Sequence, residues 1–205
     1  MNPLKKVLSL FLAFTSLIYD ANADEKRPDI VFIIVDDLND WVGCLGGHPD
    51  AKSPNIDALA SRGMLFSQGY CNSPQCRPSR TSLNHGVYAY KTGTYFNARH
   101  PQETKITTPS MQQYFMQNGY RVASGGKVFH GTPGKFGDVL LPKPRDPKPP
   151  KEEDNFHAMR APNDGYALNV ADQEMGDYKV ASWASDQGQK GTDKPLSRAG
   201  GVERP

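Results

Sequence analysis

The sequence predicts an α/β fold in which a mostly parallel sheet is flanked by helices. Residues 29–35 form an uninterrupted apolar and β-branched run, which is typical of a strand covered on both faces in a parallel sheet. A second, shorter strand pattern at residues 120–123 leads directly into glycines. Helical spacing of apolar residues occurs at 53–63, 107–118 and 171–189, so helices accompany these strands.

The length of 205 residues suits one sizeable domain and is short for two. The first 23 residues have the order of a secretory signal peptide: two lysines, an apolar run over residues 7–19, and small residues at Ala21 and Ala23. The apolar run is too short for a comfortable membrane span. We therefore expect residues 1–23 to direct export to the periplasm or the medium, with no stable membrane span. An uncleaved membrane anchor is the alternative.

The balance of charged residues gives no indication of a nucleic-acid partner, and we expect none. The formal net charge is +2, and neither its sign nor its size indicates nucleic-acid binding. The three cysteines, Cys44, Cys71 and Cys76, are an odd number for an exported protein. One thiol therefore needs an explanation other than a disulfide within the chain.

The first strand ends abruptly at Asp36 and Asp37. Neighbouring side chains of a strand point to opposite faces, so these carboxylates can converge only where the strand gives way to a loop. Ligands bind at the carboxyl ends of strands in open α/β sheets, and carboxylate oxygens suit Ca²⁺ or Mg²⁺. A solvated acidic turn is the alternative interpretation.

A glycine-rich loop over residues 38–50 should follow, and then a short amphipathic helix. Ser53 is placed as its N-cap, Pro54 as its first residue and Gly63 as its end. Residues 64–66, Met-Leu-Phe, are predicted to begin another strand.

The segment Cys76-Arg77-Pro78-Ser79-Arg80 has the local chemistry of a nucleophile that faces an anion. Pro78 disfavours helical geometry at Arg77, so Cys76 should lie just ahead of a helix that begins around Ser79. Unpaired amides and the helix dipole favour a thiolate and bound anions at such a position, and Arg80 adds a fixed charge. The alternative is a structural cysteine in a proline-rich turn.

The second strand pattern repeats the geometry of the first. Residues 120–123 open into glycines and then present Lys127 and His130. Lysine binds an anionic group as a point charge, and histidine can deliver a proton to a leaving oxygen. Two ordinary surface residues are the alternative.

Helices and a loop account for most of the remaining chain. Thr108 or Ser110 can cap the helix at 107–118, and the helix at 171–189 should cover the sheet. Residues 131–164 are rich in proline and charge, so we expect an irregular loop without a core of its own.

Three ordered elements together resemble the type I sulfatase family: Asp36-Asp37, the C-x-P-S-R pattern at 76–80 and Gly-Lys-Val-Phe-His at 126–130. These enzymes depend on formylglycine and belong to the alkaline-phosphatase-like superfamily. The last element is especially similar to the iduronate-2-sulfatase-like branch. The resemblance covers about residues 28–195, and it implies an alkaline-phosphatase-like sandwich.

The resemblance also implies a nucleophile and a metal site. Cys76 would be converted to 3-oxoalanine (formylglycine) by a formylglycine-generating or anaerobic sulfatase-maturing enzyme. Asp36, Asp37 and the group made from Cys76 would bind Ca²⁺, with Mg²⁺ as a possible replacement.

Further site residues follow from the same resemblance. Arg80 and Lys127 would stabilise the transferring sulfuryl group, and His130 would assist proton movement. The implied reaction is hydrolysis of a sulfate ester on a sulfated sugar or glycosaminoglycan.

The chain departs from the family pattern after Arg80. Asn84 and His85 stand where an apolar and a hydroxyl residue are usual, and the maturing enzyme reads this stretch in the unfolded chain. Conversion of Cys76 would leave Cys44 and Cys71 free to pair. A disulfide between Cys71 and Cys76, with Cys44 buried, is the alternative.

Residues 196–205 hold two glycines, two arginines and a proline, with no strand pattern. We expect an aberrant tail outside the family, as a change of reading frame would produce. Residues 24–195 would then be the N-terminal part of a sulfatase catalytic domain, incomplete at its C-terminus, and this chain would have low activity or none. The alternatives are a phosphoester or phosphonate hydrolase of the same superfamily and a non-catalytic remnant.

Overall fold

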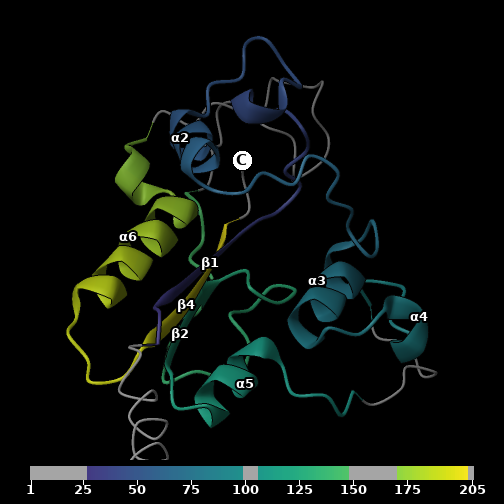
Figure 1. The fold of residues 1–205 in the computed structure, drawn as a ribbon, viewed down its shortest axis with the longest axis vertical. Coiled ribbons are helices and arrows are strands. Elements are labelled where there is room, and N and C mark those ends of the chain that lie inside the picture. The colour runs from purple at the N-terminus through teal and green to yellow at the C-terminus, as the bar shows by residue number, and fades with distance from the viewer. Residues whose placement is uncertain (1–26, 99–105, 148–169, 203–205) are drawn as a thin grey trace, which may run out of the picture.

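The computed structural model describes residues 27–98, 106–147 and 170–202, and their strands form one parallel sheet (Figure 1). The spatial order is β1-β4-β2-β3, and every neighbouring pair is parallel. The strands are β1 (Ile30–Val35), β2 (Arg121–Gly126), β3 (Val139–Leu141) and β4 (Leu196–Val202). The predicted α/β class with a mostly parallel sheet is therefore confirmed.

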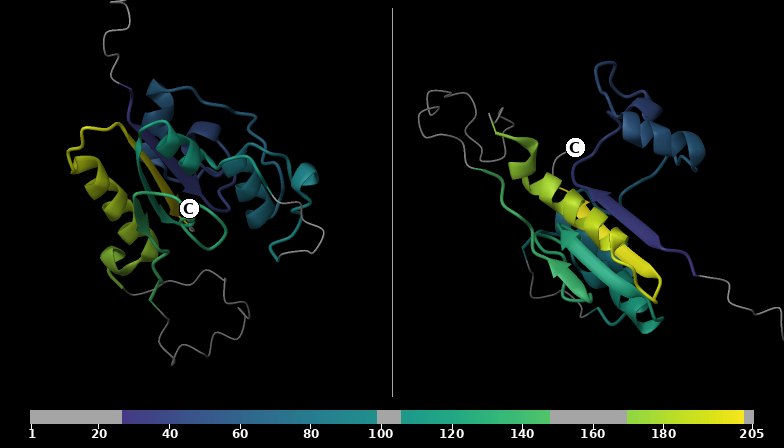
Figure 2. Two further views of the ribbon diagram at one scale, coloured as in Figure 1. Left: turned by 90° about the horizontal axis from the view of Figure 1, so that it is seen from below. Right: turned by 90° about the vertical axis from the view of Figure 1, so that its left-hand side faces the viewer.

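Helices lie on both sides of this sheet. Figure 1 shows α6 on one side and α3 and α5 on the other, and Figure 2 shows α6 running alongside the strands. The helical elements are η2 (Gly43–Leu45), α2 (Pro54–Arg62), α3 (Cys76–His85), α4 (Ala89–Thr92), α5 (Met111–Gln117), η4 (Asp172–Glu174) and α6 (Gly176–Gln189). The buried core follows this layering, since Val122, Ala123 and Ala199 of the sheet are buried together with Val180 of α6.

The strand predicted at residues 29–35 is present as β1, but it is not covered on both faces. Val31 and Ile33 are 52% and 65% exposed. The reason is position, because β1 ends the strand order of the described sheet and α6 packs over β4 and β2.

The expectation that residues 196–205 lack strand structure is wrong for residues 196–202. They form β4, which pairs with β1 through Ile30 and Ser197 and with β2 through Arg121 and Leu196. Its glycines allow close approach of another backbone, because a Cβ on Gly201 would lie 2.2 Å from the carbonyl carbon of Lys127. The reason for treating these residues as foreign to the fold therefore disappears.

The strand predicted to begin at Met64-Leu65-Phe66 is absent. These residues have no regular structure and are 79%, 46% and 75% exposed. A strand needs a hydrogen-bonded neighbour, and the described sheet has no strand there. Apolar, bulky composition was therefore insufficient evidence for a strand.

The helices predicted at residues 53–63 and 107–118 are present as α2 and α5. Pro54 is the first residue of α2 and Gly63 its C-cap, as expected. Ser53 holds the N-cap position without capping, since its Oγ accepts a hydrogen bond from the Gly43 N–H at 2.7 Å. Ser110 does cap α5, in a reciprocal capping box with Gln113.

The later segments agree in part with the prediction. The helix expected over 171–189 is present as η4 followed by α6. The loop expected over 131–164 contains the short strand β3, because Val139–Leu141 pairs with β2 through Ala123 and Val139. Residues 148–164 of that loop lie outside the described residues, as does the signal peptide predicted at 1–23. In the described ranges, no helix has the length and apolar character to cross a bilayer.

Candidate active site

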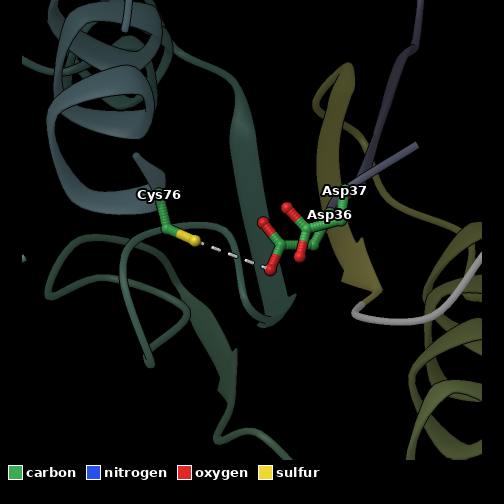
Figure 3. Close-up of side chains that lie close together, drawn as sticks. All are labelled: Asp36, Asp37 and Cys76. Carbon is green, nitrogen blue, oxygen red and sulfur yellow. Dashed lines mark hydrogen bonds between the residues drawn. The ribbon is translucent and has the colours of Figure 1, made fainter. Parts of the chain in front are cut away.

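The end of β1 brings two adjacent carboxylates to one side. The backbone N–H of Asp36 still donates to the Val202 carbonyl of β4 at 3.0 Å, so Asp36 continues the strand ladder. Asp37 then adopts a left-handed conformation, with φ of 55°, and the strand stops. Ligand atoms of Asp36, Asp37 and Cys76 consequently lie within 4.8 Å of one another (Figure 3). The predicted convergence of the two carboxylates is confirmed.

Cys76 is the first residue of α3, so this helix begins three residues earlier than the prediction placed it. Pro78 can occupy the first turn because the N–H groups of that turn have no intrahelical acceptor. The Sγ atom of Cys76 points toward Asp36 and lies 3.9 Å from Oδ2 (Figure 3). The sulfur therefore faces the two carboxylates across a short gap.

Three charged side chains form the centre of the site, and we call Asp36, Arg80 and Lys127 the ion cluster. Asp36 and Arg80 are buried, and Lys127 is half-buried. Arg80 Nη2 donates to Asp36 Oδ1 at 2.7 Å, and Lys127 Nζ pairs with Asp36 Oδ2. Burial alone would raise the pKa of Asp36, but hydrogen bonds and charges from Arg80 and Lys127 outweigh it and lower the pKa. Asp36 is therefore ionised, and with one anion and two cations the ion cluster keeps a net positive charge.

The turn that carries Lys127 is fixed to two other elements. Gly126 ends β2 with φ of 70°, and the Lys127 N–H donates to the Gly201 carbonyl of β4 at 2.9 Å. Arg80 Nη1 donates to the carbonyls of Lys127 and Val128, the latter at 3.3 Å. One guanidinium thus binds both the carboxylate of Asp36 and the backbone beside Lys127.

The more accessible groups are Asp37, Cys76 and His130, which we call the rim. Asp37 and His130 are exposed, and Cys76 is half-buried. Partial burial, followed by the charges of Lys127 and Arg77, lowers the pKa of His130 from its ordinary value of 6.5. These shifts favour the neutral imidazole, which can accept a proton near pH 7.

Of the three possible ligands Asp36, Asp37 and Cys76, the two carboxylates suit a hard cation. Carboxylate oxygens suit Ca²⁺ or Mg²⁺, whereas a thiol sulfur does not. The ammonium of Lys127 already rests on Asp36 Oδ2, which shows that positive charge is favourable at this carboxylate. A divalent cation would therefore compete with Lys127 for the same oxygen.

Sequence reasoning missed the part that Asn84 plays in this site. Asn84 is only 2% exposed, and its Nδ2 donates to the Arg80 carbonyl at 2.9 Å and to the Val128 carbonyl at 3.2 Å. His85 likewise has a contact, since its Nδ1 lies 3.0 Å from the Thr108 carbonyl. Helical spacing was the available signal, because residues 76, 80 and 84 recur every four positions on one face.

The three cysteines are unpaired. Cys71 is exposed, while Cys44 is half-buried in a turn where its N–H donates to Asp57 Oδ1 at 2.8 Å. The structure thus contains neither the Cys44 to Cys71 pairing nor the Cys71 to Cys76 disulfide.

Comparison with known proteins gives a family match over most of the chain. Residues 28–179 match the family model described as Sulfatase. The chain is 28% identical, over 95% of its length, to a protein named Sulfatase from Formosa agariphila. It is 37% identical, over 54% of its length, to Iduronate 2-sulfatase of Homo sapiens. The chain covers 44% and 20% of these two relatives, so it spans less than half of their length.

A solved structure shows that the fold is shared as well. A putative sulfatase from Bacteroides thetaiotaomicron superposes with a TM-score of 0.64 at 23% identity. The match covers 88% of this chain and 36% of the solved chain.

Proposed function

Because the chain belongs to the sulfatase family, we propose that its protein hydrolyses sulfate esters on a sulfated sugar or glycosaminoglycan. The observation that carries this proposal is the meeting of Cys76 with Asp36 and Asp37 at the carboxyl ends of parallel strands. Beside them, Arg80 supplies a buried cation and Lys127 a half-buried one. An anionic ester that entered here would meet a nucleophile position and preorganised positive charge.

The nucleophile in this proposal is a 3-oxoalanine made from Cys76 by a formylglycine-generating or anaerobic sulfatase-maturing enzyme. As a hydrate, that group supplies one hydroxyl for attack and a second through which sulfate can be expelled. Cys76 suits the role because it begins α3, where helix amides and Arg80 favour an anion.

The remaining site residues have roles that their surroundings support. Arg80 and Lys127 stabilise negative charge on the sulfuryl group, and both are held by backbone contacts. His130, whose pKa is lowered, can take up and return a proton at the rim. Asp36 and Asp37 are the residues that would hold Ca²⁺, or Mg²⁺ in its place, and the cation would polarise a sulfate oxygen.

A 2-O-sulfated uronic acid is the substrate class that we propose. Iduronate 2-sulfatase of Homo sapiens is 37% identical over the matched part, and the Gly-Lys-Val-Phe-His element supports the same branch. We also propose export through residues 1–23, which would place the enzyme where sulfated polysaccharides occur.

Conversion of Cys76 and binding of inorganic sulfate test this function. Among the described residues, two carboxylates converge with Cys76, which is fewer ligands than the six to eight oxygens that Ca²⁺ prefers, so we expect low turnover by this chain. The chain should be produced with and without a maturing enzyme, and the mass of the tryptic peptide Gly63–Arg80 measured. We expect an aldehyde only with the enzyme, and sulfate binding that is lost in a Lys127→Ala variant.

The same preparations separate sulfatase from phosphatase chemistry. Turnover of 4-nitrophenyl sulfate should exceed that of 4-nitrophenyl phosphate and should disappear in a Cys76→Ala control. A Cys76 that stays a thiol beside the maturing enzyme, or a preference for phosphate or phosphonate esters, would contradict the proposal.

A further inference from the structure

Asn84 joins three elements of the site through one buried amide. Its Nδ2 donates to the carbonyls of Arg80 and Val128 at 2.9 and 3.2 Å. Its Oδ1 accepts from Gln112 Nε2 of α5 at 3.0 Å. Asn84 and Gln112 are each 2% exposed, so water does not substitute readily for these bonds.

The orientation of this amide is determined by its partners. Both carbonyls are acceptors and require the NH₂ group of Asn84, which leaves Oδ1 facing Gln112. Gln112 must then present its own NH₂ group, and its Oε1 is buried with no partner among the described atoms. Hydrogen bonding thus specifies a single arrangement of both side chains.

This arrangement acts on the turn that carries Lys127. The Val128 carbonyl accepts from Asn84 Nδ2 and, at 3.3 Å, from Arg80 Nη1. The preceding carbonyl, that of Lys127, accepts from the same guanidinium. Asn84 therefore holds one side of the turn whose lysine meets Asp36.

We propose that Asn84 is a positioning residue, which holds the Lys127–Val128 turn so that the Lys127 ammonium reaches the sulfate site. It acts through the Val128 carbonyl and does not touch the substrate. The inference rests on the proposed function, because it assigns to Lys127 the binding of the sulfuryl group. It also explains why a polar residue occupies a position that is usually apolar in sulfatases.

The opposing view is that Asn84 only fills space between α3, α5 and the turn. Asn84→Leu keeps the branching and the number of side-chain heavy atoms but leaves the Val128 carbonyl and Gln112 Nε2 without this partner. Asn84→Leu combined with Gln112→Leu removes both buried amides. The double variant should therefore regain stability, because no buried amide is left unpaired. The hydrogen bond to the Val128 carbonyl stays lost in both variants.

The test compares these two variants with the parent chain, all with Cys76 as a thiol and confirmed by mass. Asn84→Leu should lower the midpoint of thermal unfolding by roughly 2–10 °C, and the double variant should regain at least part of it. The affinity for inorganic sulfate should fall by about tenfold in both variants. The NMR titration of His130 should move toward its ordinary pKa in both, because Lys127 is displaced.

A buried amide elsewhere provides the matched control. Gln187 of α6 is also 2% exposed and accepts from Arg121 Nη2 at 2.9 Å, at the opposite end of β2 from Lys127. Gln187→Leu should lower the unfolding midpoint without changing sulfate affinity or the His130 titration.

Two results would overturn the inference. Either the double variant binds sulfate and titrates His130 like the parent, or Asn84→Leu alone changes neither property. If the parent chain binds no sulfate, the proposed function fails. The His130 titration then still decides whether Asn84 positions the Lys127–Val128 turn. An unchanged titration then rejects a positioning role for Asn84, and a shifted one supports it.

Discussion

Asp36 and Asp37 are neighbours in the chain but differ in their surroundings. Asp36 is 8% exposed, continues the ladder of β1 and pairs with two cations. Asp37 is exposed and lies in left-handed backbone beyond the strand. One residue therefore anchors the site, and the other is available to a ligand.

The same contrast separates the ion cluster from the rim. The side chains of Asp36, Arg80 and Lys127 are 10%, 5% and 11% exposed, and each charge has an opposite charge beside it. His130 is exposed and Cys76 half-buried, so both can be reached. The site thus combines an ion-paired, preorganised interior of net positive charge with accessible groups that can react.

The largest expected effect comes from removing the anchor. Asp36→Ala leaves the buried Arg80 and the half-buried Lys127 without their shared counter-charge, which should lower the free energy of unfolding by about 3–5 kcal/mol. Urea unfolding of this variant, with Asp37→Asn as the control because Asn tolerates the left-handed backbone, measures the difference. Equal losses in the two variants would contradict the division into anchor and rim.

A smaller loss is expected where β4 meets the turn that carries Lys127. A Cβ on Gly201 would lie 2.2 Å from the Lys127 carbonyl carbon and 2.6 Å from the Val128 nitrogen, and both are backbone atoms. Gly201→Ala should therefore cost about 1–3 kcal/mol and displace Lys127. Gly191→Ala, at a glycine with open space, is the matched control, and both are measured by urea unfolding.

Acid should remove the stabilisation that the ionised Asp36 gives to the ion cluster. Because the pKa of Asp36 is lowered below 3.8 in the folded state, its contribution is complete above that value and is lost as pH falls through the folded pKa. Urea unfolding from about pH 4 downward should show this decline. The free energy of unfolding should change less with pH in Asp36→Asn than in the parent chain. An identical pH dependence in the two would contradict the assignment of this decline to Asp36.

The smallest effect on stability is expected at the rim. Asn tolerates left-handed backbone as Asp does, so Asp37→Asn should change the free energy of unfolding by no more than about 0.5 kcal/mol. Its consequence should appear in cation binding, because one of two carboxylates is lost. Calorimetric titration with Ca²⁺ should show at least a tenfold weaker site, and unchanged affinity would exclude Asp37 as a ligand.

The sequence was informative where a residue pattern and a strand end coincide. Asp36 and Asp37 follow an unmistakable apolar run, and Lys127 follows a strand that opens into glycines, so their meeting at one edge could be predicted. The position of Cys76 and Arg80 depended on the family resemblance, because α3 reaches the sheet from a different part of the chain.

The features that the sequence did not predict depend on tertiary contacts. Gly200 and Gly201 indicated a loop by composition, yet β4 needs small residues where the Lys127 backbone crosses it. Met64 and Phe66 looked like strand residues but have no strand beside them. Asn84 looked like a defect in a motif until its partners on α5 and the Lys127 turn were known.

The place of β4 between β1 and β2 also constrains the timing of biosynthesis. A ribosome releases residues 30–35 and 121–126 well before residues 196–202, so the two earlier strands wait without the neighbour that joins them. At ordinary elongation rates the delay between the first and last of them is on the order of ten seconds. During that interval the nascent chain carries unpaired strand edges, which makes it a natural client for chaperones.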